Sequence, residues 1–261
     1  MSSMSINYQP KMSIRISLIT VCFNSEATIR DTLVSVINQS YFENIEYILI
    51  DGKSNDNTLN IIDEYSHLVD KFISEKDSGI YHAMNKGLLL ATGELVGFIN
   101  SDDIFLDNNV IENLVKSFDI KNFDIIYSNL YYVKSRNTDK IVRKWRSGKY
   151  YDKFFDDGNV PPHPTFYIKS NCLKKMGLFN LNFNLAADYE FMFRALKKYK
   201  FQPYYVNLYT VKMRLGGASN KTFSNIFKQN IEILNAWKIN DVIIPFFFIP
   251  LKFWKKITQY F

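Results

Sequence analysis

The chain has 261 residues, of which 47% are hydrophobic and 16% aromatic, and its formal net charge is +6. This length is enough for one substantial core, or for one domain with a smaller appendage, and the hydrophobic content excludes a disordered chain. The charge predicts an anionic partner, but the basic residues are scattered except near the C-terminus, which argues against nucleic acid.

The first half of the chain alternates predicted strands with predicted helices. Runs rich in β-branched residues predict strands at residues 14–22, 47–50, 71–74 and 95–99. Amphipathic spacing predicts helices at residues 26–39, 58–65 and 80–91. Strands separated by helices indicate βαβ units, and therefore an α/β fold with a mostly parallel sheet.

Polar clusters follow three of these strands. They are Asn24-Ser25-Glu26, Asp51-Gly52-Lys53-Ser54 and Asn100-Ser101-Asp102-Asp103. In open α/β sheets, ligands bind beyond the carboxyl ends of the strands, so we expect these clusters to line a binding site.

The second half of the chain changes character. Strands are expected within residues 124–144, a loop and strand at 160–169, and helices at 187–199 and 223–237. We find no repeat, low-complexity segment or flexible linker, so the two halves are expected to share one core. The last twenty residues form a separate apolar and basic tail.

Cysteine spacing and apolar runs bear on the compartment. Cys22 and Cys172 form no CxxC pair, so two buried free thiols in a reducing cytosol are favoured over a structural zinc site. Residues 1–11 are polar and predict no signal peptide. The most apolar stretch, residues 242–251, is too short to span a bilayer, so a cytoplasmic protein is expected.

Asp102 and Asp103 are adjacent carboxylates after a buried strand. Their repulsion is costly unless a cation or hydrogen bonds offset it, and hard oxygen ligands of this type suit Mg²⁺ or Mn²⁺. An Asp-Asp pair alone is more often an Asp-rich turn that caps the next helix, here expected near Asp107.

Further motifs favour metal binding by Asp102 and Asp103 over a turn that only caps a helix. The segments Thr20-Val21-Cys22-Phe23-Asn24, Asp51-Gly52-Lys53-Ser54-Asn55-Asp56-Asn57-Thr58 and Gly79-Ile80-Tyr81-His82-Ala83-Met84-Asn85-Lys86-Gly87 resemble the nucleotide-binding signature of family 2 glycosyltransferases, which have the GT-A fold. Lys53 and Asn57 replace glycines of the usual second motif, and His82 stands where related sequences often carry Asp. The resemblance continues in order through His163-Pro164-Thr165-Phe166, Gly177-Leu178-Phe179-Asn180, Ala186-Ala187-Asp188-Tyr189-Glu190-Phe191 and Gly216-Gly217-Ala218-Ser219.

The resemblance implies roles for individual residues. Asp51 is expected to hold the base or ribose of a nucleotide sugar. The same site is expected to include Thr20, Phe23, Glu26, Ser54, Asn85 and Asp102, of which Asp102 supports the ribose or a metal-bound water. Asp103 is expected to bind the Mn²⁺ or Mg²⁺ that bridges the donor diphosphate, and Asp188 to be the general base.

Several of these residues also have structural interpretations. His163 and Glu190 are acceptor-side candidates, but a lone His before Pro is as often structural, and Glu190 fits a helix face near the site. Tyr81 and Asn85 either lie near the donor or pack the start of their helix. No late His is present as an extra metal ligand, so the diphosphate and water are expected to complete the coordination shell.

The implied chemistry agrees with this division of roles. A divalent cation neutralises the charge that develops on a nucleotide diphosphate leaving group. The nucleophile is a neutral alcohol, so a positioned carboxylate accepts its proton. In-line attack from the opposite face inverts the anomeric carbon.

The sequence therefore predicts a GT-A-like α/β fold, with a Rossmann-like, mostly parallel central sheet flanked by helices. We expect a catalytic domain at residues 1–220, with a nucleotide-sugar half at 14–103 and an acceptor half at 104–220, and a helical extension at 221–261. The expected reaction transfers a hexose, from UDP-glucose or UDP-galactose, through a β1,3 linkage. The expected acceptor is a sugar such as GlcNAc on an undecaprenyl-type lipid diphosphate, in O-antigen or exopolysaccharide synthesis at the inner face of the bacterial inner membrane.

Three other functions fit this sequence less well. A nucleotidyltransferase acting on sugar phosphates would need a basic, Gly-rich phosphate loop that is not found. A dinucleotide-dependent oxidoreductase would need G-x-G-x-x-G after the first strand, where this chain has Val21-Cys22-Phe23-Asn24-Ser25. A non-catalytic carbohydrate-binding protein would have no use for both Asp103 and Asp188.

The C-terminal tail has two interpretations. Residues 243–251 are apolar and aromatic, and Lys252, Lys255 and Lys256 follow them. This composition suits peripheral contact with an anionic membrane. A helix packed on the catalytic domain fits equally well.

Overall fold

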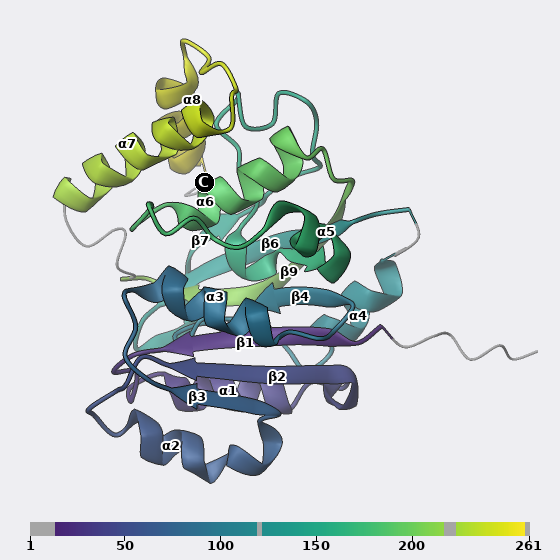
Figure 1. Cartoon of the computed structure of the whole chain (residues 1–261), viewed down its shortest axis with the longest axis vertical. Coiled ribbons are helices and arrows are strands. Elements are labelled where there is room, and N and C mark those ends of the chain that lie inside the picture. The colour runs from purple at the N-terminus through teal and green to yellow at the C-terminus, as the bar shows by residue number, and fades with distance from the viewer. Residues whose placement is uncertain (1–13, 119–121, 217–222, 259–261) are drawn as a thin grey trace, which may run out of the picture.

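A single mixed sheet organises the protein. The computed structural model describes residues 14–118, 122–216 and 223–258, and within them nine strands follow the order β3-β2-β1-β4-β8-β6-β9-β5, with β7 paired to β6 (Figure 1). The strands are β1 (Ile16–Cys22), β2 (Ile45–Asp51), β3 (Lys71–Ser74), β4 (Leu95–Phe98), β5 (Ile104–Phe105), β6 (Ile125–Lys134), β7 (Asn137–Trp145), β8 (Tyr167–Lys169) and β9 (Pro203–Arg214).

Helices flank this sheet. They are α1 (Ile29–Ile37), α2 (Thr58–Glu64), α3 (Ile80–Leu90), α4 (Val110–Ser117), α5 (Ser170–Met176), α6 (Ala187–Phe193), α7 (Phe223–Ile239) and α8 (Phe248–Thr258). A π-helical turn, Arg194–Lys198, continues α6. The predicted α/β fold, with a mostly parallel sheet flanked by helices, is confirmed.

The first half of the sheet is parallel throughout. β1 pairs with β2 and β4, and β2 pairs with β3, all in parallel register. Every residue of β1 and β2 is buried, because helices cover both faces. Side chains alternate along β1: Ile19 and Val21 join the core beneath α3, whereas Leu18 and Cys22 join the core beneath α1 and α2. All four strands predicted here are present.

The second half of the sheet is mixed and was predicted less completely. β8 is antiparallel to both β4 and β6, and β6 is parallel to β9. The sequence patterns predict neither the strands β5 and β9 nor the helix α5. In β9, buried and exposed residues do not alternate regularly, and its pairing with β6 shifts register twice, so a two-residue period is hard to recognise. The helix predicted at residues 26–39 begins at Ile29, because Ser25 to Thr28 form a turn.

Buried charge at the amino end of the sheet is fully paired. The Glu46 carboxylate accepts hydrogen bonds from the Ser17 hydroxyl at 2.5 Å, the Lys71 ammonium at 2.7 Å, and the amide and hydroxyl of Thr92 at 2.8 and 2.6 Å. Burial raises the pKa of this carboxyl, but the four donors together lower it to about 2. The network ties β1, β2 and β3 together at the end opposite the polar clusters.

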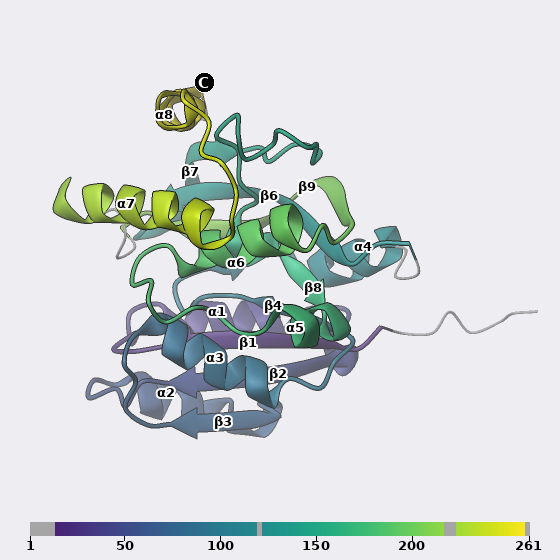
Figure 2. The same cartoon turned by 45° about the horizontal axis from the view of Figure 1, so that its top comes forward.

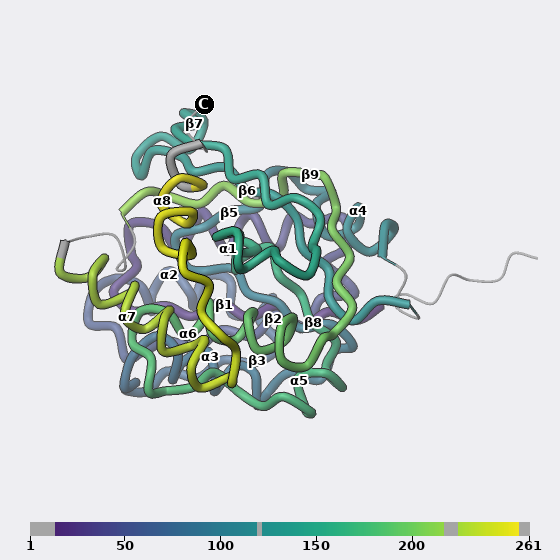
Figure 3. Tube along the Cα trace, turned by 90° about the horizontal axis from the view of Figure 1, so that it is seen from above, coloured from purple at the N-terminus to yellow at the C-terminus, as the bar shows by residue number. Residues whose placement is uncertain are grey.

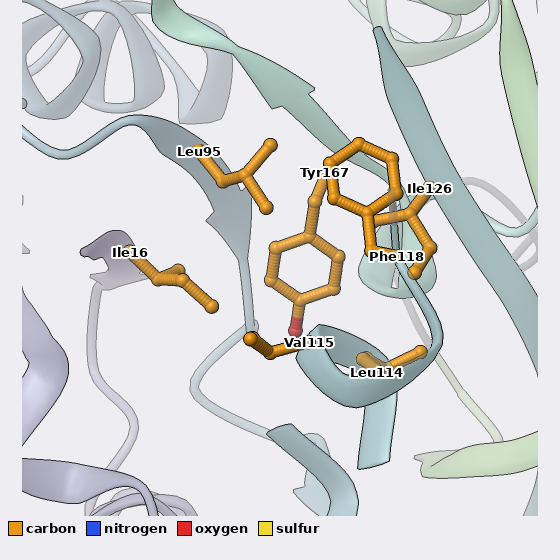
Figure 4. Close-up of a pocket in the computed structure, with 7 residues that line it drawn as sticks. All are labelled: Ile16, Leu95, Leu114, Val115, Phe118, Ile126 and Tyr167. Atoms are coloured by element: carbon orange, nitrogen blue, oxygen red, sulfur yellow. The ribbon is translucent and has the colours of Figure 1, made fainter. Parts of the chain in front are cut away.

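The core between the sheet and α4 is almost completely filled. A cavity of about 10 Å³ remains, lined by Ile16, Leu95, Leu114, Val115, Phe118, Ile126 and Tyr167 (Figure 4). The Tyr167 side chain extends toward Val115, and its buried hydroxyl has no hydrogen-bond partner within the described ranges. A cavity this small and apolar suits no ligand.

Helix α7 packs beside α6, and α8 follows α7 farther from the sheet (Figures 2 and 3). Trp237 of α7 is fully buried against Phe193 and Phe248, and its indole N–H donates to the Tyr189 hydroxyl at 3.0 Å. The start of α8 is therefore part of the core, as the packing interpretation of the tail requires. The side chain of Lys256 and residues 259–261 of the tail lie outside what the structure describes.

Candidate active site

A cleft of about 850 Å³ opens at the carboxyl ends of β1, β2, β3 and β4. The loops that end these strands supply most of its walls, in agreement with the rule for open α/β sheets. Its lining residues are Val21, Cys22, Phe23, Asn24, Ser25, Ala27, Thr28, Gly52, Lys53, Asn55, Lys76, Asp77, Gly79, Ile80, Ala83, Ser101, Asp102 and Gly216. Of the predicted nucleotide-sugar residues, Phe23 and Asp102 are in this set.

Asp51 and Ser54 lie beneath the cleft and hold its loops. Asp51 is fully buried and accepts hydrogen bonds from the Ser54 amide at 3.0 Å, the Ser54 hydroxyl at 2.5 Å and the Ser74 hydroxyl at 2.7 Å. The Asn24 amide donates in turn to the Ser54 hydroxyl at 2.8 Å. Lys53 takes a φ of +65°, so it adopts the left-handed conformation that glycine would favour. The loop therefore keeps its turn without the glycine.

The other three residues predicted for the nucleotide sugar point elsewhere. Thr20 is fully buried and accepts a hydrogen bond from the Tyr47 hydroxyl at 3.1 Å. Glu26 is exposed, and its carboxylate accepts from the Asn57 amide at 2.8 Å. The Asn85 side chain donates to the Phe179 carbonyl at 3.0 Å and accepts from the Phe179 amide at 2.9 Å. These partners argue against direct contact with the nucleotide for Asn85, and favour the packing interpretation.

Asp103 is a buried carboxylate with one unpaired oxygen. Its Oδ2 accepts from the Asn100 amide group at 3.2 Å, while Oδ1 has no partner among the described residues. Burial raises the pKa of this carboxyl well above its usual range, and the charge of Asp102 raises it further. Asp102 lines the cleft and Asp103 stands directly behind it.

Arg214, at the end of β9, holds the backbone of the loop that carries these two carboxylates. Its guanidinium donates to the Asp102 carbonyl at 2.8 Å and to the Ser135 carbonyl at 3.1 Å, and it also pairs with Asp31 of α1. The motif Gly216–Ser219 follows Arg214 at once. Gly216 lines the cleft, while residues 217–219 lie outside the described ranges.

No ready-made metal cage is present in the described part of the chain, where no three His, Cys, Asp or Glu side chains converge. The unpaired Oδ1 of Asp103 beside the Asp102 carboxylate nevertheless fits a hard divalent cation, because such ions bind through one or two carboxylates plus substrate phosphates. The residues present thus suit a cation that arrives together with an anionic ligand.

Asp188 faces the site across Tyr81. Its Oδ1 accepts hydrogen bonds from the Tyr81 hydroxyl at 3.0 Å and the Tyr189 amide at 2.9 Å. Burial raises the pKa of the Tyr81 hydroxyl, and the charge of Asp188 raises it further, so this phenol stays a donor. Tyr81 follows Ile80, which lines the cleft, so α3 connects the cleft to Asp188.

Helix α7 anchors the segment that carries Asp188. The Glu232 carboxylate accepts hydrogen bonds from three consecutive amides, those of Asn184 at 3.1 Å and of Leu185 and Ala186 at 2.8 Å each. The three amides come just before α6, so the Glu232 carboxylate lies at the start of this helix. A negative charge is favourable there, because the first N–H groups of a helix have no partner within it. Helix α7, which lies within the extension predicted at residues 221–261, therefore holds the segment that carries Asp188.

Glu190 of α6 forms an ion pair with Arg194, the first residue of the π-helical turn that continues this helix. The pair is 2.8 Å apart, and Arg194 also donates to the carbonyls of Met176 and of Leu178. Asn240, the residue after α7, donates to Glu190 at 3.1 Å. Glu190 is thus committed to internal partners, which favours the structural interpretation over contact with an acceptor.

His163 packs between aromatic rings close to Asp188. It stacks on Phe98 at 5.2 Å and meets Phe179 edge-on at 5.8 Å between ring centroids. Burial lowers the pKa of the imidazole, although the charge of Asp188 opposes this shift, so the ring is neutral near pH 7. The structural interpretation of His163 fits this environment, and an acceptor contact stays a prediction.

The sequence patterns did not single out several residues that line the cleft. Asp77, which carries a carboxylate, is one of them. It lies in the loop between β3 and α3, in the segment Lys76-Asp77-Ser78-Gly79. The same signal that marked the other loops, polar residues at the end of a strand, was present here.

Comparison with known proteins identifies the family of this chain. Residues 17–180 match the model of the family described as glycosyl transferase family 2, which is more than half of the chain. The chain therefore belongs to glycosyl transferase family 2 and is a glycosyltransferase. This membership favours glycosyl transfer over a nucleotidyltransferase or a non-catalytic carbohydrate-binding protein.

Two curated relatives illustrate the similarity. An uncharacterized glycosyltransferase of Mycobacterium tuberculosis is 30% identical over 187 residues, covering 69% of this chain and 68% of its own. A PGL/p-HBAD biosynthesis glycosyltransferase of Mycobacterium bovis is 24% identical over 233 residues, covering 87% of this chain and 88% of its own.

Solved structures share the fold. S. aureus TarS residues 1–349 match with a TM-score of 0.63 and 20% identity, over 86% of this chain and 72% of that chain. This chain spans only 43% of a longer TarS structure. A mannosyltransferase from Pyrobaculum calidifontis, solved with GDP-Man and Mn²⁺, matches with a TM-score of 0.61 and 15% identity, over 95% of this chain and 76% of its own.

The role of Asn85 can be tested directly. Asn85→Ala removes both hydrogen bonds to the Phe179 backbone and leaves two buried groups unpaired, so we expect a loss of about 2 kcal/mol in the free energy of unfolding. Affinity for UDP should stay within about twofold of the wild type, because the cleft is untouched. Denaturant titration and calorimetry measure the two quantities. Asn60→Ala, an exposed change on α2, is the matched control, and a large loss of UDP affinity in Asn85→Ala would restore the donor-binding role.

Proposed function

We propose that this glycosyltransferase transfers a hexose from a UDP-sugar, with inversion, to a hydroxyl of a lipid-diphosphate-linked sugar in bacterial surface-polysaccharide synthesis. The observation that carries the proposal is the pairing of a strand-end cleft, walled by Asp102, with a half-buried carboxylate, Asp188, held beyond Tyr81. A donor in the cleft and an acceptor at Asp188 would meet between them.

The nucleotide part of the donor is supported by related structures. TarS has been solved with UDP and with UDP-GlcNAc, at TM-scores of 0.61 in each case. We assign the chain to O-antigen or exopolysaccharide synthesis, with an undecaprenyl-type GlcNAc lipid as the acceptor. For this pathway we propose glucose or galactose as the donor sugar and a β1,3 linkage. The corresponding location is the cytoplasmic face of the inner membrane.

Asp188 is the proposed general base. Its Oδ1 is fixed by Tyr81 and by the Tyr189 amide, and none of the described residues donates to Oδ2. That oxygen can accept the proton of the acceptor hydroxyl as the hydroxyl oxygen bonds to the anomeric carbon. The bond from this carbon to the diphosphate oxygen breaks on the opposite face, so the configuration inverts. The nucleotide diphosphate leaves with the bonding electron pair.

Asp103, with Asp102 beside it, is the proposed holder of Mn²⁺ or Mg²⁺. Bound there, the cation would neutralise charge on the donor diphosphate. The unpaired Oδ1 of Asp103 supports this assignment, since a buried carboxylate oxygen without a donor requires some partner. Arg214 fixes the loop by its bond to the Asp102 carbonyl.

The proposed membrane contact uses the exposed part of the C-terminal extension. No helix in the described ranges is both long and apolar enough to cross a bilayer. The segment between α7 and α8 and the outer face of α8 expose a set of large apolar side chains, which we call the aromatic patch: Ile243, Phe246, Phe247, Phe253 and Trp254. Phe246 is 93% exposed and Phe247 65%. Aromatic rings beside Lys252 and Lys255, on a chain of net charge +6, suit the boundary of an anionic bilayer.

The base assignment predicts the behaviour of Asp188→Asn. This change keeps the shape but removes the proton acceptor, so transfer should fall by about 10²-fold or more while UDP-sugar binding survives. Transfer to a lipid-linked acceptor and calorimetric titration with UDP measure the two effects. Asp63→Asn, an exposed change on α2, should retain full activity. Near-normal turnover by Asp188→Asn would exclude Asp188 as the base.

The membrane assignment predicts the behaviour of a double variant, Phe246→Ser with Phe247→Ser. Truncating the tail is a poor test, because Phe248 covers Trp237. The double variant changes only exposed rings, so thermal unfolding should be unchanged while binding to phosphatidylglycerol-containing liposomes falls by about tenfold or more. Leu208→Ser, an exposed apolar change on β9, should bind normally. Undiminished liposome binding by the double variant would show that the aromatic patch is no anchor.

A further inference from the structure

Helix α3 connects the cleft to the proposed general base. Gly79 and Ile80, at the start of this helix, line the cleft. The next residue, Tyr81, has its side chain in the core, where it is 9% exposed. Its hydroxyl donates to Asp188 Oδ1 at 3.0 Å. The position of the base relative to the cleft is therefore set by a short stretch at the start of α3.

Aromatic packing leaves the Tyr81 ring little freedom to move. The ring lies 5.7 Å from that of Phe179, which in turn stacks on Phe191 of α6 at 4.4 Å between centroids. Asn85, four residues after Tyr81 on α3, holds the backbone of Phe179 with two hydrogen bonds. Because α3 and α6 both pack against Phe179, the Tyr81 hydroxyl keeps its place beside Asp188.

The Tyr81 hydroxyl acts on this carboxylate as a neutral donor. Burial raises the pKa of the phenol, and the negative charge of Asp188 raises it further, so the hydroxyl keeps its proton at neutral pH. A neutral donor orients a carboxylate without supplying a positive charge, which would weaken the carboxylate as a proton acceptor. An Arg or Lys in the same place would not have this property.

Tyr81 supplies a constraint that the second donor to Oδ1 cannot supply. The Tyr189 amide, at 2.9 Å, belongs to the residue next to Asp188 in the chain and moves with it. Within the described ranges, the Tyr81 hydroxyl is the one donor to Asp188 that comes from another segment. This hydrogen bond therefore fixes the rotation of the carboxylate relative to the rest of the site.

We propose that Tyr81 is a positioning residue for the transfer reaction: its hydroxyl holds the Asp188 carboxylate in the orientation that presents Oδ2 to the acceptor hydroxyl. This inference rests on the proposed function, in which Asp188 is the general base. Tyr81 takes no proton itself and acts through Asp188.

The substitution Tyr81→Phe tests this role, because it keeps the ring and removes only the hydroxyl. The carboxylate can then rotate away from the acceptor, so kcat should fall by about tenfold or more. The KM for the UDP-sugar, and the calorimetric affinity for UDP with Mn²⁺, should stay within about twofold of the wild type, because the lining residues Gly79 and Ile80 are unchanged. Transfer from UDP-glucose and UDP-galactose to undecaprenyl diphosphate-linked GlcNAc, and hydrolysis of both donors by water, measure kcat.

A double variant shows whether Tyr81 acts through Asp188. Asp188→Asn removes the base, so the Tyr81 hydroxyl has no base left to position. Adding Tyr81→Phe to Asp188→Asn should therefore lower kcat by less than about twofold more. A hydroxyl that acted on the donor or on the fold would lower kcat by the same factor in both backgrounds.

The matched control is Tyr127→Phe. Tyr127 is buried in the same core, and its hydroxyl donates to the Gly148 carbonyl at 2.8 Å. This variant loses one hydrogen bond from a buried tyrosine, as Tyr81→Phe does, but leaves Asp188 untouched, so its kcat should match that of the wild type. Thermal unfolding of each variant verifies that the assayed protein is folded.

The outcomes separate this inference from the proposed function. A normal kcat in folded Tyr81→Phe, an equal loss from Tyr81→Phe in both backgrounds, or an equal loss in Tyr127→Phe would overturn the positioning role and leave Asp188 as the base. Normal turnover by Asp188→Asn, or no turnover of either donor by the wild type, would overturn the proposed function and this inference with it.

Discussion

The site depends on carboxylates that the fold buries at the carboxyl end of the sheet with too few donors to satisfy them. At the amino end, Glu46 accepts four hydrogen bonds and is fully paired. At the carboxyl end, Asp103 and Asp77 each keep one buried oxygen without a partner in the described ranges. An unpaired buried acceptor costs about 1–3 kcal/mol. Both oxygens lie at the end of the sheet where the proposed cation and donor would bind.

Asp51 shows how the same end of the sheet is kept rigid. Its oxygens take their hydrogen bonds from Ser54 and Ser74, and the Asn24 amide bonds to Ser54. One satisfied carboxylate thus joins the loops after β1, β2 and β3. Asp51 therefore fixes the loops near Asp103 and Asp77, whose carboxylates are not fully hydrogen-bonded. Loops fixed in advance are what an electrostatic binding site requires.

The acceptor side is assembled from the opposite end of the chain. Glu232 and Trp237, both on α7, bond to the segment around Asp188, and Arg194 ties that segment to the loop after α5. Asn85 on α3 holds the same loop at Phe179. Helix α7 therefore acts as a brace for the proposed base, while the aromatic patch beyond it remains exposed. This arrangement lets one extension serve the catalytic core and, as proposed, a membrane surface.

Sequence patterns predicted the parallel half of the sheet well, because its strands are continuous β-branched runs and its helices are amphipathic. They missed β9, whose irregular burial hides its period. Motif order located the loops of the site, but not the direction of each side chain. Thr20, Asp51 and Ser54 face inward because their partners, Tyr47, Ser74 and Asn24, come from other segments. The sequence could not show that Asp77 Oδ2 lacks a hydrogen-bond donor among the described residues, because this depends on which side chains pack around it.

The most direct test of the account compares Asp103→Asn with Asp51→Asn in the presence of chelator. Replacing Asp103 removes a buried carboxyl that has too few donors, so the free energy of unfolding in chelator should rise by about 1 kcal/mol or more, while transfer in a separate assay with Mn²⁺ is lost. Replacing Asp51 removes a satisfied acceptor, so the free energy of unfolding should fall by about 2 kcal/mol. Denaturant titration of both variants beside the wild type measures this contrast. A loss of stability in Asp103→Asn equal to that in Asp51→Asn would contradict the claim that the fold stores an unsatisfied carboxylate for its ligands.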